Sequence, residues 1–271
     1  MEMSERRHML TLYFSGTGNT KYIAELFSSK MGAACFSIED EVNFVQEIKS
    51  HKTIAFCYPV YGSRVPRNMR EFVAKYMADL TGKKIIIFVT QMFFSGDGAR
   101  VFTDLFWDGS IDVIYAEHFK MPNNVSNILI FREPGRKKIQ KYIINTEEKM
   151  SEVCNDIRKG IVKKRGFSFF SQILGRVQGK SWQGNSTEVY PDSTSLEFKA
   201  QTGVKIYKNC DACNLCVNIC PMMNLANING KITQRSNCIV CYRCVNRCPK
   251  RAITVMMLKI RPRWQYKGLG N

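Results

Sequence analysis

Five apolar runs, separated by helical patterns, dominate the first 160 residues of the chain. They lie at residues 9–14, 53–58, 84–89 and 111–116, with a weaker candidate at 34–38. The runs are nearly continuous instead of alternating with polar residues, which is typical of parallel strands buried on both faces.

Apolar residues at helical spacing occupy the segments between these runs. One set comprises Met69, Phe72, Val73, Tyr76, Met77 and Leu80. A second set comprises Ile23, Leu26, Phe27 and Met31, and a third comprises Ile139, Ile143, Met150, Val153, Ile157 and Ile161. Strands that alternate with amphipathic helices predict a doubly wound parallel α/β sheet.

The second half of the chain has a different composition. Residues 163–209 begin with a basic amphipathic stretch, "KKRGFSFFSQILGRVQGK", and continue with polar, turn-rich sequence. We therefore predict a first domain at 1–162, a bridging segment at 163–202, a compact second domain at 203–257 and a basic tail at 258–271.

Eight of the eleven cysteines form two runs with identical spacing. They are Cys210, Cys213, Cys216 and Cys220, followed by Pro221, and Cys238, Cys241, Cys244 and Cys248, followed by Pro249. This C-x2-C-x2-C-x3-C-P spacing is that of bacterial ferredoxins with two [4Fe-4S] clusters, in which the fourth cysteine of each run ligates the other cluster. A pair of zinc sites is the alternative, but zinc spacing needs neither the third nearby thiol nor the proline. Alanine and valine, at 212 and 240, stand where such runs often have glycine.

The three remaining cysteines, Cys35, Cys57 and Cys154, lie in apolar strand or helix patterns. We expect them to act as small hydrophobic residues of the core.

A loop rich in glycine and hydroxyl groups follows the first predicted strand. It comprises Ser15, Gly16, Thr17, Gly18, Asn19 and Thr20. A nucleotide-binding P-loop requires a Gly-Lys pair that is absent here, and a dinucleotide fingerprint requires a third glycine where this chain has Lys21. The loop is similar to the phosphate loop of flavodoxins, which bind flavin mononucleotide (FMN) at a helix N-terminus.

The ends of two further predicted strands suit a flavin ring. The candidate flavin-binding residues there are Pro59, Val60, Tyr61, Gly62, Gln91, Met92, Phe93, Phe94, Ser95 and Gly96. In a doubly wound sheet, ligands bind beyond the carboxyl ends of the strands, where these residues lie. We expect Tyr61 to stack on the ring, Gly62 to admit a backbone carbonyl and Met92 to Phe94 to supply the other wall. Ordinary packing in the core or in loops is the alternative for each aromatic residue.

Together, "SGTGNT", "PVYGSRVP", "TQMFFSGDGA", "MPNN" and the two cysteine runs give the chain a specific resemblance. It resembles fusion proteins of anaerobic bacteria that join a flavodoxin domain to a bacterial-type 2[4Fe-4S] ferredoxin domain. The resemblance implies a flavodoxin-like sheet followed by a small α+β ferredoxin domain, with FMN and two [4Fe-4S] clusters in one electron-transfer polypeptide.

Iron–sulfur clusters transfer one electron at a time, whereas a flavin accepts one or two. The expected function is therefore electron transfer that interconverts one-electron and two-electron steps. A flavin-dependent reductase of a small organic substrate is the alternative, and a redox sensor is a weaker one. The sequence identifies no catalytic residue, no electron donor or acceptor and no oligomeric state.

Net charge and the N-terminal sequence indicate which partners and which cellular location to expect. The formal net charge of +17 favours an acidic redox protein partner. The basic tail gives little support for nucleic-acid binding, and we expect it to be solvated or packed on the first domain. The segment 166–180 is amphipathic enough to lie on a membrane surface, although packing between domains is commoner for such a piece. No signal peptide is recognisable, so the expected location is the cytoplasm.

Overall fold

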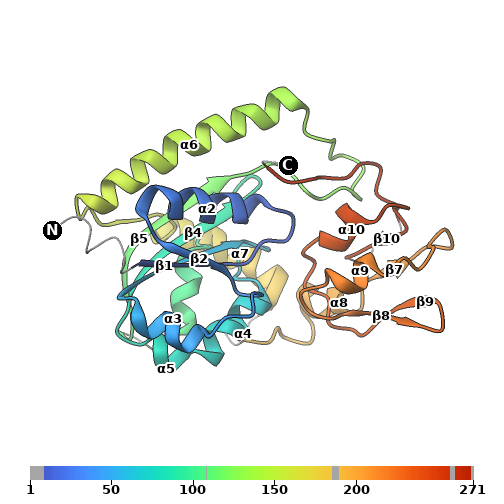
Figure 1. Cartoon of the computed structure of the whole chain (residues 1–271), viewed down its shortest axis with the longest axis horizontal. Helices are drawn as coiled ribbons and strands as arrows, with labels where there is room; N and C mark the ends of the chain where they lie inside the picture. The colour runs from blue at the N-terminus through green and yellow to red at the C-terminus, as the bar shows by residue number, and fades with distance from the viewer. Residues whose placement is uncertain (1–8, 108, 185–188, 257–259, 270–271) are drawn as a thin grey trace.

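A computed structural model of the chain describes residues 9–107, 109–184, 189–256 and 260–269 (Figure 1). Its main sheet has six parallel strands in the order β2-β1-β3-β4-β5-β6. The strands are β1 (Met9–Tyr13), β2 (Ala34–Ser37), β3 (Thr53–Pro59), β4 (Lys84–Gln91), β5 (Asp112–Lys120) and β6 (Lys163–Lys164). The first five coincide with the five apolar runs, and the predicted doubly wound fold is confirmed.

Both faces of the sheet are buried, which explains the continuous apolar strands. In β3, Ile54, Phe56 and Tyr58 enter one core cluster, whereas Ala55 and Cys57 enter the other. Cys154 is also buried in the second cluster and Cys35 packs against it, so the core placement of these cysteines is confirmed.

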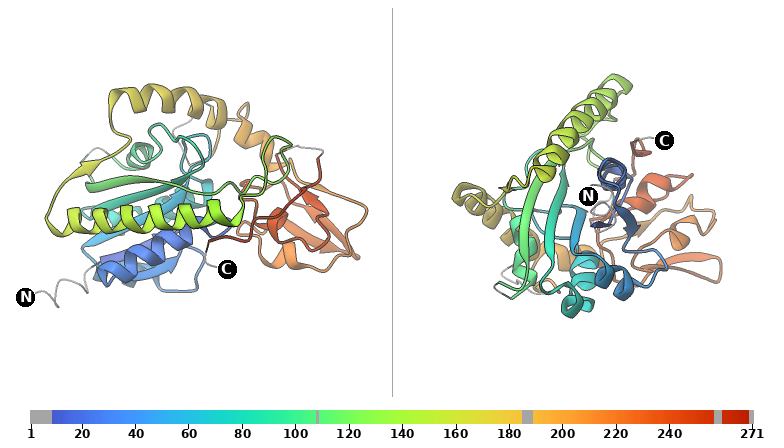
Figure 2. Two further views of the ribbon diagram at one scale, coloured as in Figure 1. Left: turned by 90° about the horizontal axis from the view of Figure 1, so that it is seen from above. Right: turned by 60° about the vertical axis from the view of Figure 1, so that its left-hand side comes forward.

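Helices cover each face (Figures 1 and 2). One side carries α2 (Asn19–Met31) and α6 (Arg136–Arg158). The other side carries α3 (Phe44–Ser50), α4 (Arg67–Lys75), α5 (Met77–Leu80) and the 3₁₀ helix η2 (Arg100–Leu105). The pattern at 69–80 predicts one helix, but Tyr76 leaves the helical conformation and separates α4 from α5. Its ring joins a cluster with Phe44 and Phe72.

Strand order reverses between β1 and β3, because the chain adds β2 on one side of β1 and then crosses to the other. This switch point is where ligands bind in open α/β sheets. The loops after β1, β3 and β4 all end at this edge of the sheet.

The predicted bridging segment packs largely on the first domain. It contains β6, α7 (Phe169–Gln183) and α8 (Leu196–Gln201). β6 pairs with β5 at the edge of the sheet, and Arg70 of α4 forms a buried ion pair with Glu197 of α8 at 2.9 Å.

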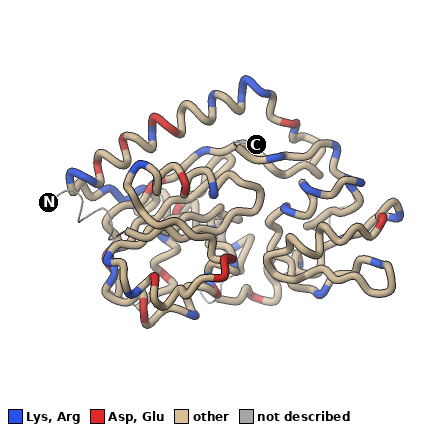
Figure 3. Tube along the Cα trace, viewed as in Figure 1, with Lys and Arg blue, Asp and Glu red and all other residues tan. Residues whose placement is uncertain are grey.

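The C-terminal module is small and contains two hairpin-like sheets. Its elements are β7 (Lys205–Ile206), α9 (Leu215–Asn218), β8 (Leu225–Ile228), β9 (Lys231–Gln234), α10 (Arg243–Arg247) and β10 (Ile253–Thr254). β7 pairs with β10 and β8 pairs with β9, both antiparallel. Lys and Arg outnumber Asp and Glu along this module (Figure 3). Among the described helices, none combines the length and the apolar character needed to cross a membrane.

Candidate functional site

Residues 15–20, which follow β1 and enter the first turn of α2, are the predicted phosphate loop, and we keep that name for them. Gly18, the N-cap of α2, has φ 103°, a conformation that a residue with a side chain adopts only at a cost. Its amide donates to Ser15 Oγ at 3.1 Å. Thr20 Oγ1 and Thr90 Oγ1 lie 2.8 Å apart, so the first turn of α2 is tied to the end of β4. The loop and the amides of the first turn of α2 suit an anion.

The loop after β3 is a tight two-residue turn. Tyr61 and Arg64 exchange backbone hydrogen bonds of 3.1 and 3.0 Å, and Gly62 and Ser63 between them have φ of 55° and 60°. Positive φ at both central positions is typical of a type I′ turn. A Cβ at Gly62 would overlap the side chain of Trp182 in α7, so this position admits only glycine without rearrangement.

A cavity of about 260 Å³ opens between these loops and the C-terminal module. Of the predicted flavin-binding residues, the structure brings Ser15, Gly16, Thr17, Asn19, Thr20, Pro59, Val60, Tyr61, Gly62, Gln91 and Met92 to its wall. The residues not predicted there are Thr90, Met121, Pro122, Asn123, Asn124, Val125, Trp182, Val240, Tyr242 and Met256. The "MPNN" segment belonged to the resemblance, whereas no local pattern marks Trp182, Val240, Tyr242 or Met256.

Five predicted residues lie outside this wall. Gly18 caps α2 behind the loop. Phe93 and Phe94 are 66% and 49% exposed. Ser95 is buried with its Oγ 2.8 Å from His118 Nδ1, and Gly96 lies against the backbone of Gly175 in α7. The chain therefore turns away from the cavity after Met92, and Gly96 packs against helix α7.

The two cysteine loops repeat one backbone geometry. Ala212 and Asn214 in the first have φ of 53° and 64°, and Val240 and Tyr242 in the second have φ of 58° and 60°. These left-handed conformations turn each loop around a centre, and Val240 adopts one despite its β-branched side chain. Backbone amides donate to Cys220, Cys238 and Cys248 Sγ at 3.3 Å each, as expected for sulfurs that ligate a cluster.

The cysteine thiols form two groups, and each group contains thiols from both cysteine runs. Burial raises the pKa of Cys216 to about 11, with further contributions from Cys248, Cys210 and Cys213. Burial raises the pKa of Cys238 to about 12, and Cys241 and Cys220 add to it. Cys248 thus lies near the first three cysteines, and Cys220 lies near Cys238 and Cys241, as the spacing predicts.

A cubane holds its four cysteine sulfurs farther apart than one ion does, because iron atoms lie between them. Within the described ranges, no three His, Cys, Asp or Glu side chains are close enough to hold a single metal ion. Cluster assembly has to release the thiol protons, since only thiolates bind iron. The donor sets fit iron–sulfur clusters.

Arg243, between Cys241 and Cys244, binds the phosphate loop from the opposite domain. Its guanidinium donates to Ser15 O at 2.8 Å and to Gly16 O at 3.2 Å. It also pairs with both carboxylate oxygens of Glu39 at 2.6 Å. A Cβ at Gly16 would overlap the carbonyl of Cys241, so the two loops touch through their backbones.

The C-terminal tail also reaches the phosphate loop. Tyr266 donates from its hydroxyl to Asn19 Oδ1 at 2.6 Å, and its amide donates to Asn246 Oδ1 at 2.7 Å. Leu269 is buried against the α2 and α6 core. Of the two alternatives for the tail, packing holds for its described residues 260–269, which contact the first domain and also the cysteine module, where Gln265 donates to Cys248 O at 2.7 Å.

Comparison with known proteins identifies both domains. A family model described as a flavodoxin domain matches residues 10–129, and one described as a 4Fe-4S dicluster domain matches residues 201–253. These domains support FMN and at least one 4Fe-4S cluster in an electron-transfer protein. No curated protein matches the chain.

Several solved structures are similar to the first domain. Oxidised Flavodoxin 2 from Bacillus cereus is 15% identical, covers 56% of this chain and 97% of its own, and has a TM-score of 0.40. Trp Repressor Binding Protein from Bacillus subtilis is 13% identical, with coverages of 42% and 85% and a TM-score of 0.37. An FMN-dependent NADH-azoreductase from Bacillus anthracis, in complex with FMN, is 10% identical, with coverages of 54% and 99% and a TM-score of 0.33.

Proposed function

We propose that this chain, which joins a flavodoxin domain to a 4Fe-4S dicluster domain, passes electrons between two [4Fe-4S] clusters and FMN. Val240 and Tyr242 carry the proposal. They alternate with Cys238, Cys241 and Cys244 in one loop and line the same cavity as the phosphate loop and Tyr61. The second cysteine set and the flavin site therefore share a wall.

The residues of the cavity divide into two groups for holding FMN. Ser15, Thr17 and Asn19, with the N-terminal amides of α2, suit the phosphate. Tyr61, Trp182 and Met92 supply apolar walls for the ring. When bound, FMN adds a centre that accepts one or two electrons to clusters that each accept one, so single electrons can be combined into pairs or pairs divided.

Two phenols in the wall are held neutral. Burial raises the pKa of Tyr61 well above its usual range, and it raises the pKa of Tyr242 strongly as well. Both side chains stay protonated at neutral pH. They therefore add no negative charge beside the flavin, and the Tyr242 hydroxyl donates to Met256 Sδ at 3.2 Å.

The test is anaerobic purification with iron, sulfide and flavin quantification, followed by stepwise reductive titration. We expect about eight irons, eight labile sulfides and one FMN per chain, with about four electrons taken up in total. Four irons per chain would contradict the second cluster, and zinc without labile sulfide would overturn the iron–sulfur assignment.

The partner that fits this surface is an acidic redox protein inside the cell. The formal charge of +17 supports it, since opposite charge accelerates encounter and salt screens that attraction. Electron exchange with an acidic ferredoxin should slow as ionic strength rises. A rate independent of salt would contradict electrostatic steering.

A flavin-dependent reductase of a small organic substrate is the second candidate. The observation that favours it is the cavity itself, whose wall carries the side chains of Tyr61 and Tyr242, because a reductase needs room for a substrate and a proton donor near the reduced ring. Anaerobic turnover of small organic acceptors, lost in Tyr61→Phe or Tyr242→Phe while electron uptake by clusters and flavin persists, would support this function. Turnover that neither substitution changes would remove the phenols as its proton donors.

A further inference from the structure

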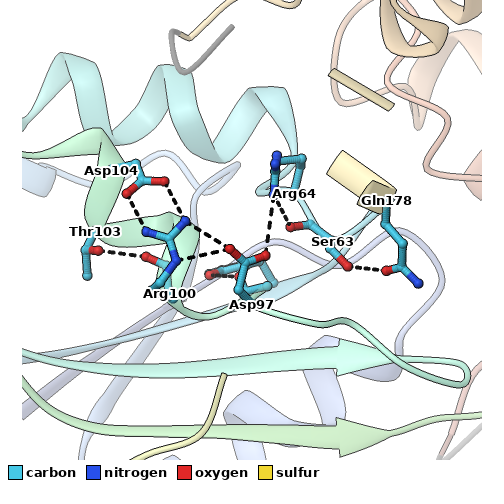
Figure 4. Close-up of polar contacts among 9 residues, drawn as sticks. Ser63, Arg64, Asp97, Arg100, Thr103, Asp104 and Gln178 are labelled. Atoms are coloured by element: carbon cyan, nitrogen blue, oxygen red, sulfur yellow. Dashed lines mark hydrogen bonds and ion pairs between the residues drawn. The ribbon is translucent and has the colours of Figure 1, made fainter. Parts of the chain in front are cut away.

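Helix α7 has an inner face made of small residues. Gly175 lies over the buried carboxylate of Asp97, and Gly179 lies over the guanidinium of Arg64. A Cβ at either glycine would overlap these groups. Asp97 is paired with two arginines: its Oδ1 lies 3.5 Å from Arg64 Nη1, and Arg100 pairs with the same carboxylate at 2.9 Å (Figure 4). Ser63 also donates a hydrogen bond to Gln178 of α7. The helix is thus held with this face against the domain.

The opposite face of α7 is apolar and exposed. Its members are Phe169 (71% exposed), Phe170 (77%), Ile173 (42%), Leu174 (50%) and Val177 (70%). At 3.6 residues per turn they span an arc of about 140°, centred opposite the two glycines. Figure 2 shows α7 as a ridge on the outside of the domain. We call these five side chains the α7 ridge.

The charge around the α7 ridge is positive. At 100° per residue, Arg176 lies just outside one edge of this arc and Lys180 just inside the same edge, and neither makes an ion pair with any residue that the structure describes. The nearby carboxylates are neutralised, since Asp97 pairs with Arg64 and Arg100, and Asp104 pairs with Arg100 at 2.8 Å. No acidic residue occurs between positions 157 and 184.

We propose that the α7 ridge binds the surface of an anionic lipid bilayer, an activity separate from the proposed electron transfer. Large apolar side chains beside lysine and arginine are the composition of helices that lie in the membrane interface. The polar face that such a helix normally turns to water is replaced here by the domain itself. A convex ridge suits a deformable bilayer better than it suits a protein, which would need a matching groove.

A second copy of the chain is a poorer occupant, because each copy would bring Arg176 and Lys180 to the same contact. An acidic protein remains the alternative that the experiment has to separate. The helix is docked through buried groups, so substitutions on its outer face leave that docking unchanged.

The test measures sedimentation of the full holoprotein with vesicles at low salt. One set contains equal parts of phosphatidylglycerol and phosphatidylcholine, and the other contains phosphatidylcholine alone. We expect binding to the anionic vesicles that weakens with salt. Phe170→Ser/Val177→Ser should reduce the partition constant by about 100-fold, from roughly tenfold per apolar side chain. Arg176→Gln/Lys180→Gln should reduce it by about 25-fold, from roughly fivefold per cation.

The matched control is Trp107→Ser/Ile228→Ser, which removes two apolar side chains that are 86% and 56% exposed elsewhere. It should bind vesicles as the unsubstituted protein does, and all variants should retain iron and flavin. Absence of vesicle binding, equal binding to both vesicle types, or equal loss in the control would overturn the proposal. Unchanged vesicle binding in Phe170→Ser/Val177→Ser, combined with slower electron exchange with an acidic ferredoxin, would assign the ridge to a protein partner instead.

Discussion

Replacing Arg243 by methionine tests whether the C-terminal module holds the FMN phosphate loop in shape. Methionine keeps an unbranched apolar side chain but removes the guanidinium. The lost contacts are those with Ser15 O, Gly16 O, Ile219 O and both oxygens of Glu39. Ser15 O and Gly16 O then have no donor from the other domain among the residues that the structure describes.

The magnitude follows from the two bonds to the loop. A hydrogen bond to a charged group contributes about 1.5–3 kcal/mol. The Arg243 side chain is 21% exposed, so water replaces part of what is lost and the lower value applies. Two bonds at about 1.5 kcal/mol each give about 3 kcal/mol, which corresponds to a rise of up to about 100-fold in the FMN dissociation constant.

The assay is fluorescence titration of flavin-depleted protein with FMN, with iron measured in the same samples. Arg247→Met is the matched control, because Arg247 lies on the same helix and is exposed. Glu39→Gln removes the ion pair but leaves both bonds to the loop, so it should change the dissociation constant by a few-fold at most. An Arg243→Met protein with full iron content and unchanged FMN affinity would refute the reasoning.

Four further predictions concern the site and its support. Ser15→Ala/Thr17→Ala should weaken FMN retention and leave the iron content intact, as measured by flavin and iron per chain after gel filtration. Tyr266→Phe removes the hydroxyl that donates to Asn19 and should speed FMN release roughly fivefold, since one hydrogen bond contributes about 1 kcal/mol. Release is measured by stopped flow, and a rate equal to that of the unsubstituted protein would contradict a role for the tail. Arg70→Met leaves the Glu197 carboxylate buried without its cation and should lower the free energy of unfolding by about 3–5 kcal/mol, whereas Arg70→Met/Glu197→Leu should restore most of it in urea titrations. Burial, aided by Arg165, lowers the pKa of His118 to about 4. The unfolded chain therefore binds the proton more tightly than the folded chain, and the free energy of unfolding falls as pH drops from about 6.5 toward 4. Between pH 7 and pH 5 this amounts to about 2 kcal/mol, and His118→Asn should remove that part of the pH dependence of urea unfolding.

The strands of the main sheet could be predicted from the sequence, because a parallel strand buried on both faces leaves a continuous apolar run. Residues 53–58 and 84–89 show such runs and are strands in the structure. Cysteine spacing is equally local, since three thiols two residues apart must wrap one centre. The position of the loop at residues 15–20 was predictable too, because its glycines and hydroxyls follow an apolar run and precede a helical pattern.

The residues that complete the site could not be predicted in this way, because long-range packing brings them together. Residues 91–96 form a single loop in sequence, yet Gln91 and Met92 line the cavity while Gly96 faces Gly175 of a helix some 80 residues later. Trp182 and Val240 reach the same cavity from elements far along the chain, and Arg243 and Tyr266 bind the phosphate loop from the other domain. No residue period encodes such contacts, because they depend on how separately folded segments pack together. Composition showed α7 to be amphipathic, but the packing of Gly175 and Gly179 on a buried ion pair decided which of its faces remains exposed.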